Sequence, residues 1–103
     1  MGIRDLFGRR RRGIAADPAD LDHLRRWCRT RVGVEAYLEP ETLVSVPGLC
    51  LVAFDGEWTR RPVGDVATAR RLAARLKLPL FDASIQGYPQ RMRDYEPVSY
   101  THL

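Results

Sequence analysis

The chain has 103 residues, an apolar share of 45% and a formal charge of +4 at pH 7. This length and composition predict one small globular domain and exclude an intrinsically disordered chain. No apolar run approaches the roughly 18 residues of a membrane span, and none follows the charged start as in a secretory signal. We therefore expect a soluble, cytoplasmic protein.

The positive charge is concentrated in residues 1–13. Five arginines face one aspartate there, and four of them are consecutive: Arg9, Arg10, Arg11 and Arg12. From Ile14 onward, twelve basic residues balance twelve acidic ones. We interpret residues 1–13 as a basic arm attached to a neutral domain over residues 14–95. Such an arm favours an anionic partner.

The first predicted element is a helix from about Asp17 to Arg31. Asp17 is a suitable N-cap, and Pro18 occupies the first helical position, where its missing N–H costs nothing. Apolar residues at helical spacing predict one buried stripe on this helix. Gly33 ends it as a C-cap.

Strands follow the helix. They are predicted over residues 34–38, over 42–46 after a kink at Pro40, and over 49–54. The last run is apolar on both alternating sets of residues, which predicts a central strand. Asp55-Gly56 predicts a hairpin turn that leads into a partner strand over 57–63.

A second helix is predicted over residues 66–78, because its apolar residues recur at i, i+3, i+4 and i+7. A short strand is predicted over 80–83, and residues 85–95 are expected to be irregular. The element order α-β-β-β-α-β predicts an α+β two-layer sandwich. Its sheet is expected to be mixed and mainly antiparallel, with both helices on one face.

Two resemblances add expectations. On the segments 33–37, 55–61 and 87–95, the chain resembles a family of small proteins of uncharacterised function from high-GC Gram-positive (actinobacterial) bacteria. That resemblance implies no activity, cofactor or catalytic residue. The C-terminal run 97–103 resembles a translated sequencing adapter, so we expect residues 96–103 to be a non-native tail.

The motifs of common chemistries are missing from the chain. It contains no glycine-rich dinucleotide fingerprint and no phosphate loop. His23, Cys28 and Cys50 are too isolated in sequence to predict a metal site, and both cysteines are expected to be reduced thiols. No catalytic pair can be assembled, so we expect a protein without enzymatic activity, cofactor or metal.

Arginines mixed with aromatic residues are the remaining candidates, because such mixtures suit phosphate contact and base stacking. The predicted nucleic-acid-binding residues are those of the arm together with Arg60, Arg61, Arg91 and Arg93. The predicted partner-binding residues are Trp58, Tyr88 and Tyr95. Alternatively, Trp58 packs in the core or on an arginine, and Tyr88 packs the C-terminal segment down. The helix arginines are interpreted first as solvated surface: Arg25, Arg26, Arg29, Arg70, Arg71 and Arg75.

The hypothesis that follows is a non-enzymatic accessory domain that binds RNA or the ribosome through its arm and arginine-aromatic loops. One alternative is a protein–protein interaction module anchored by residues 88–95. Another is a peripheral protein of the inner membrane face, in which Ile3, Leu6 and Phe7 insert while arginines meet anionic lipid.

Overall fold

The computed structural model of the protein describes residues 17–95, so the predicted arm and tail lie outside the described residues. Its first described helix, α2 (Pro18–Arg29), begins where the sequence predicts. The Asp17 side chain accepts a hydrogen bond from the N–H of Ala19. The helix ends before the predicted Arg31, with Thr30 as its C-cap.

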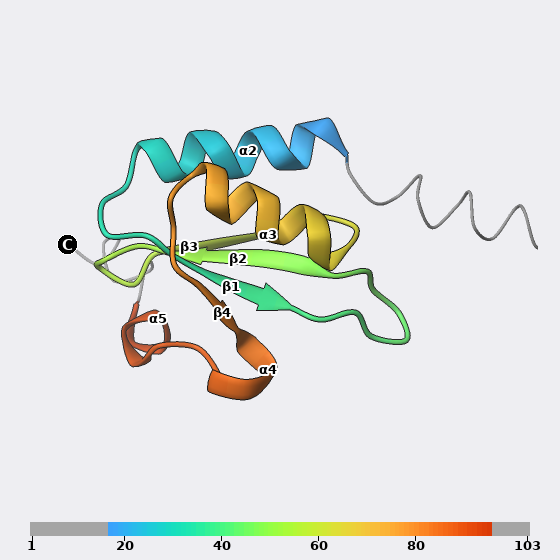
Figure 1. The fold of residues 1–103 in the computed structure, drawn as a ribbon. Coiled ribbons are helices and arrows are strands. Elements are labelled where there is room, and N and C mark those ends of the chain that lie inside the picture. The colour runs from blue at the N-terminus through green and yellow to red at the C-terminus, as the bar shows by residue number, and fades with distance from the viewer. Residues whose placement is uncertain (1–16, 96–103) are drawn as a thin grey trace, which may run out of the picture.

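Four strands form one sheet in the order β3-β2-β1-β4 (Figure 1). They are β1 (Glu35–Glu39), β2 (Gly48–Val52), β3 (Trp58–Pro62) and β4 (Leu80–Asp82). β2 pairs antiparallel with both β1 and β3, whereas β4 pairs in parallel with β1. β2 is buried along its whole length, which confirms the central position predicted from its two apolar faces.

The predicted strand over residues 42–46 is wrong, because this segment forms a turn. The N–H of Thr42 donates to the carbonyl oxygen of Ser45 at 2.9 Å. The Thr42 hydroxyl accepts from the N–H groups of Val44 and Ser45 at 3.2 and 3.1 Å. These local hydrogen bonds satisfy the backbone in place of a ladder. The turn leaves Leu43 and Val44 fully exposed.

The second long helix, α3 (Val66–Arg75), lies beside α2 on one face of the sheet, which confirms the predicted α+β arrangement (Figure 1). Asp65 caps its start by accepting from the N–H of Thr68 at 2.7 Å. It ends before the predicted Leu78, because Lys77 adopts a left-handed backbone with φ of 59°. The main core lies between the helices and alternate strand residues: Leu24, Trp27, Ala36, Leu38, Leu49, Leu51, Ala69, Leu72 and Ala73.

The segment predicted to be irregular contains two short helices, α4 (Ala83–Gln86) and α5 (Gln90–Asp94). They lie on the opposite face of the sheet from α2 and α3 (Figure 1). Residues on and between them pack over that face, where Tyr88 and Met92 approach Tyr37, Cys50 and Val52. This cover explains why β2 is apolar on both alternating sets of residues.

The cysteines are free thiols, as predicted. Cys50 is buried in β2 and Cys28 is partly buried on α2. Burial raises the pKa of Cys50 to about 12 and also raises that of Cys28, so both thiols stay protonated at neutral pH. Within residues 17–95, the structure has no helix with the length and apolarity that crossing a bilayer requires.

Candidate functional site

Arg60, a predicted nucleic-acid-binding residue, lies on the α4–α5 face of the sheet and is held by Glu39. Its Nε donates to Oε2 of Glu39 at 3.0 Å, and its terminal nitrogen lies 2.9 Å from the same oxygen. The hydrogen bond to Glu39 raises the pKa of Arg60. The pair spans β2, because β1 and β3 flank that strand.

Two predicted partner-binding aromatic residues surround the Arg60 guanidinium. That group lies 4.9 Å from the ring centroid of Trp58 and 6.0 Å from that of Tyr88. The Tyr88 hydroxyl donates to Glu39, and burial together with this bond raises the Tyr88 pKa to about 12. Trp58 therefore stacks on an arginine and Tyr88 fastens the C-terminal segment. Both contacts agree with the structural alternatives to partner binding, in which Trp58 packs on an arginine and Tyr88 holds the C-terminal segment against the domain.

Arg91 fastens α5 to the sheet. Its Nε donates to the carbonyl oxygen of Ala53 at 2.8 Å, and its Nη2 donates to Glu35 Oε1 at 2.8 Å. Tyr37 donates to the same carboxylate oxygen at 3.0 Å. The hydrogen bond from Arg91 is the main cause of the lowered Glu35 pKa. Arg91 is thus occupied within the domain.

The remaining predicted residues of the body lie apart from one another. Arg61 points to the opposite face of β3 from Arg60 and pairs with Asp20 of α2 at 3.3 Å. Arg93 is exposed on α5, and Tyr95 is partly buried beside the β2–β3 turn. The predicted arginines of the body therefore do not form one basic patch.

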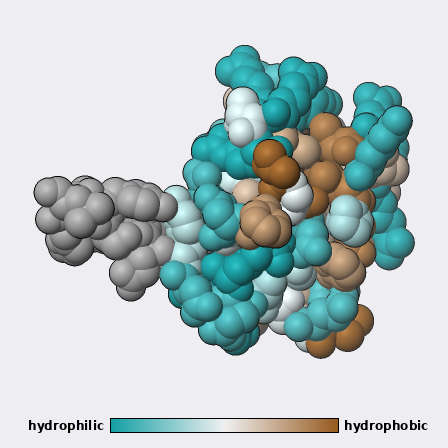
Figure 2. All heavy atoms as spheres, turned by 90° about the vertical axis from the view of Figure 1, so that its left-hand side faces the viewer, coloured by the Kyte–Doolittle hydropathy of each residue, from teal (hydrophilic) through white to brown (hydrophobic). Residues whose placement is uncertain are grey.

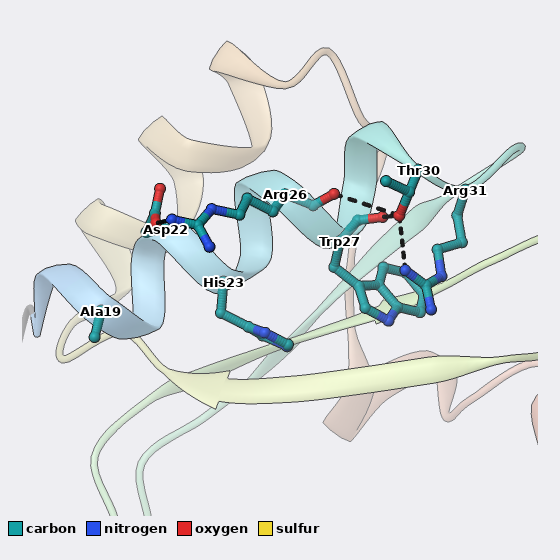
Figure 3. Close-up of a pocket in the computed structure, with 7 residues that line it drawn as sticks. All are labelled: Ala19, Asp22, His23, Arg26, Trp27, Thr30 and Arg31. Carbon is teal, nitrogen blue, oxygen red and sulfur yellow. Dashed lines mark hydrogen bonds and ion pairs between the residues drawn. The ribbon is translucent and has the colours of Figure 1, made fainter.

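A shallow hollow lies along the flank of α2 that faces β3 (Figure 3). Its volume is about 520 Å³, and it is lined by Ala19, Asp22, His23, Arg26, Trp27, Thr30 and Arg31. A second hollow of about 440 Å³ shares Thr30 and Arg31 and continues to the β2–β3 turn. Figure 2 views this end of the molecule, where apolar surface lies among hydrophilic side chains. Val32 and Phe54 are the exposed apolar residues that line the second hollow.

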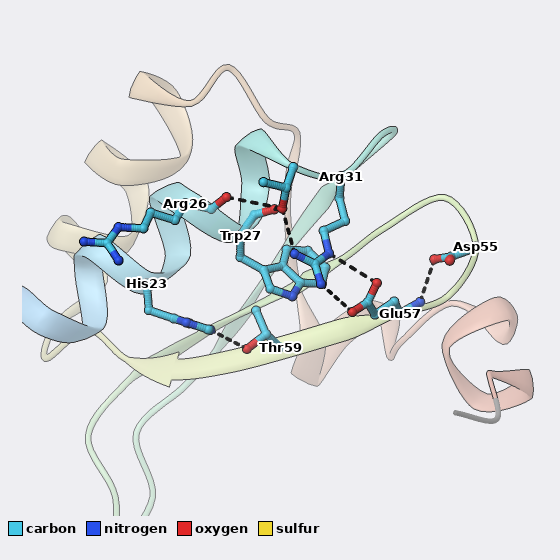
Figure 4. Close-up of polar contacts among 8 residues, drawn as sticks. His23, Arg26, Trp27, Arg31, Asp55, Glu57 and Thr59 are labelled. Atoms are coloured by element: carbon cyan, nitrogen blue, oxygen red, sulfur yellow. Dashed lines mark hydrogen bonds and ion pairs between the residues drawn. The ribbon is translucent and has the colours of Figure 1, made fainter. Parts of the chain in front are cut away.

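The polar side chains beside these hollows pair with one another (Figure 4). His23 Nε2 lies 2.8 Å from the Thr59 hydroxyl. Arg31 donates to both carboxylate oxygens of Glu57, at 3.2 and 2.6 Å, and stacks 4.6 Å from the Trp27 ring centroid. Burial and the charge of Arg61 lower the His23 pKa, so the imidazole is neutral at pH 7. These contacts join α2 to β3.

The opposite flank of α2 carries Arg25 and Arg29. Residues four apart lie on the same side of a helix, so these two arginines form one row. Because His23 occupies the β3 side, helical periodicity places the row on the flank away from β3, with Arg29 exposed to solvent. Figure 1 shows α3 on that side.

A matching row, Arg71 and Arg75, lies on α3. The hydrogen bonds of Ser84 are the main cause of the lowered Asp82 pKa in β4, and the charge of Arg70 contributes to it, which is consistent with Arg70 on the β4 side of the helix. Arg71 and Arg75 are exposed, and periodicity places them opposite the buried stripe of α3, on the side away from Arg70. Both helices run opposite to the parallel strands β1 and β4, so the two rows run side by side in the same direction.

We call these four residues the arginine seam: Arg25, Arg29, Arg71 and Arg75. Within residues 17–95, none of them makes an ion pair with a carboxylate, whereas Arg26, Arg31, Arg60, Arg61 and Arg91 all do. Arg71 donates to the Thr68 hydroxyl at 3.3 Å and helps to lower the pKa of the capping Asp65. The seam thus places on the helix layer four arginines that make no carboxylate ion pair within the described residues.

The sequence contains the two i, i+4 spacings but does not show which helix flank faces which neighbour. For that reason the seam arginines could be interpreted only as separate solvated faces.

Over residues 17–95, no group of three or more His, Cys, Asp or Glu side chains is placed to hold a metal ion. Comparison of the chain with protein-family models, with curated proteins and with solved structures finds no match.

Proposed function

We propose that the protein is a non-enzymatic accessory domain that binds RNA, free or in the ribosome, with its helix layer and its basic arm. The observation that carries this proposal is the arginine seam. Guanidinium groups bind phosphate oxygens in bidentate fashion, and four of them along one seam make a phosphate-binding surface. Arginines 9–12 add further positive charge from a segment that precedes α2.

The structure changes which arginines support the hypothesis. Arg60 and Arg91 would have to leave Glu39 and Glu35 before binding phosphate, which adds a cost to binding through the arginine-aromatic loops. The seam arginines have no such pair to break. The side chains around the α2–β3 hollows also pair internally, which favours a structural role for His23 over a catalytic one.

The test is a salt titration of RNA binding by the full chain, followed by fluorescence anisotropy. One variant replaces the four seam arginines with glutamine, and a matched variant replaces Arg9, Arg10, Arg11 and Arg12, so both lose the same charge. We expect steeply salt-dependent binding by the native chain and weaker binding by each variant. Absence of binding at low salt, or full binding by the seam variant, would contradict the proposal.

A second candidate function, a protein–protein interaction module, is favoured by the exposed apolar residues at the end of α2 and the β2–β3 turn. Val32 is 79% exposed and Phe54 is 76% exposed, and the N–H of Phe54 donates to the carbonyl oxygen of Val32 at 2.9 Å. Neighbouring exposed apolar side chains are a common feature of interaction sites. Loss of a captured partner on changing Phe54 to Ser, with RNA binding intact, would favour this candidate.

A further inference from the structure

We infer that the arginine seam takes double-helical nucleic acid by its phosphate backbone, in preference to single strands. This inference rests on the proposed function and deepens it. The surroundings of these four arginines, which make no carboxylate ion pair in the described part of the chain and lie on two parallel helices, decide which kind of nucleic acid they would hold.

Proteins bind single strands by stacking bases on aromatic side chains next to a basic groove. The aromatic residues of the described chain lie elsewhere. Trp27 is buried beneath Arg31 on the β3 side of α2, and Tyr37, Trp58, Phe81 and Tyr88 lie on the opposite face of the sheet or its cover. Phe54 belongs to the β2–β3 turn, and Tyr95 lies beside that turn. A single strand on the seam would therefore gain phosphate contacts without base stacking.

The spacing of the seam suits a surface with a high density of phosphates. Residues four apart on a helix are separated by about 6 Å along its axis, so each row presents two guanidinium groups at about that spacing. The two rows lie on neighbouring helices of the same layer (Figure 1). A double helix carries about one negative charge per 1.7 Å of its axis, so it can place several phosphates along each row at once.

The seam also offers little to read a base sequence. Side chains cannot reach the bases in the deep, narrow major groove of an RNA double helix, so arginines on a helix surface contact its phosphates and sugars. Phosphate contacts position a protein without specifying sequence. We therefore expect binding to depend on salt and on strand number, with little dependence on base composition.

The experiment measures anisotropy of the full chain with three labelled probes of equal phosphate number: an RNA double helix, a DNA double helix and an unstructured RNA single strand. A seam variant carries Arg29→Gln and Arg75→Gln. A control variant carries Arg26→Gln and Arg70→Gln, which removes the same charge from the same helices but outside the seam. Circular dichroism checks that both variants remain folded.

We expect the RNA double helix to bind more tightly than the single strand. We expect the seam variant to bind the RNA double helix with a weaker salt dependence, so that the slope of log binding constant against log salt falls by about one unit for each arginine replaced. The control variant is expected to keep the native slope. Equal or tighter binding of the single strand, with the seam variant still weakened, would overturn the inference and leave the proposed function standing. Equal losses in the seam and control variants would overturn the seam as the site.

The DNA probe separates the two sources of phosphate. Equal binding of both double helices, or tighter binding of RNA, supports backbone recognition, with contacts to the 2′-hydroxyl in the second case. Tighter binding of the DNA double helix would support the inference but contradict the RNA assignment in the proposed function. If no probe binds at low salt, both the proposed function and the inference fail.

Discussion

Arg91 of α5 binds Glu35 of β1, with 2.8 Å between the guanidinium nitrogen and Glu35 Oε1, although the two residues lie 56 positions apart. Arg91 also donates to the carbonyl oxygen of Ala53, so one side chain connects the C-terminal cover to two neighbouring strands. Both members of the ion pair are largely shielded, with side chains 30% and 33% exposed. We conclude that this clamp holds the cover on the second face of the sheet.

The clamp predicts unequal effects for two arginines of the same short helix. Arg91→Met should lower the free energy of unfolding by about 1–3 kcal/mol, because it leaves the Glu35 carboxylate and the Ala53 carbonyl without their donor. Arg93→Met, on the exposed side of α5, should change it by less than about 0.5 kcal/mol. Urea unfolding of both variants measures the difference. Equal losses would show that Arg91 does not act as a clamp.

Gly56 and Gly87 provide a second matched pair of variants, whose stabilities are compared. Its φ is 100°, and a Cβ there would collide with the carbonyl oxygen of Arg91. Gly87 also has a positive φ, 72°, but a Cβ there would meet nothing within 4 Å. Gly87→Ala should therefore cost about 1–3 kcal/mol as backbone strain alone, because its ψ of −172° lies in a region essentially restricted to glycine, and Gly56→Ala should cost more. Thermal unfolding of both variants tests this, and a smaller loss for Gly56→Ala would contradict the close packing of α5.

His23 predicts a pH dependence of stability. Its pKa in the folded protein lies below the ordinary value of 6.5, because burial and Arg61 disfavour the imidazolium. Between the lowered folded pKa and 6.5 the unfolded chain binds more protons, so this group makes stability rise with pH and fall on acidification. His23→Gln should remove that part of the dependence. Urea unfolding at several pH values measures it, and an unchanged profile in the variant would contradict the assignment.

Two leucines allow the exposed turn and the core to be compared through their effects on the free energy of unfolding. Leu43 is fully exposed, so Leu43→Ala should change the free energy of unfolding by less than about 0.5 kcal/mol. Leu49 is fully buried opposite Leu38 in the β1–β2 register, and Leu49→Ala should cost about 2–5 kcal/mol. Chemical denaturation of the two variants provides the comparison. A large loss for Leu43→Ala would show that the turn packs in solution.

Local sequence signals predict much of this fold. The Asp17-Pro18 start of α2, the central strand β2 and the turn at Asp55-Gly56 all follow from residues close together in the chain. The failure over residues 42–46 is also local: the Thr42 hydroxyl supplies hydrogen bonds that a pattern of apolar residues does not reveal.

The contacts of the candidate site depend on strand register and on the packing of distant elements. Glu39 meets Arg60 only because β1 and β3 flank β2 in this register. The same holds for the seam, since the orientation of α2 and α3 is set by the packing of their apolar stripes on the sheet. Arginine counts in the sequence therefore could not separate paired arginines from unpaired ones.

The arginine seam is tested most directly by an NMR titration of the full chain with an RNA double helix, following the backbone amide and arginine Nε–H signals. We expect the shifts to cluster at the arginine seam on α2 and α3, while Arg60 and Arg91 keep the signals of their ion pairs. Shifts concentrated at Arg60 and Trp58 on β3, or no shifts in the helix layer at low salt, would contradict this expectation.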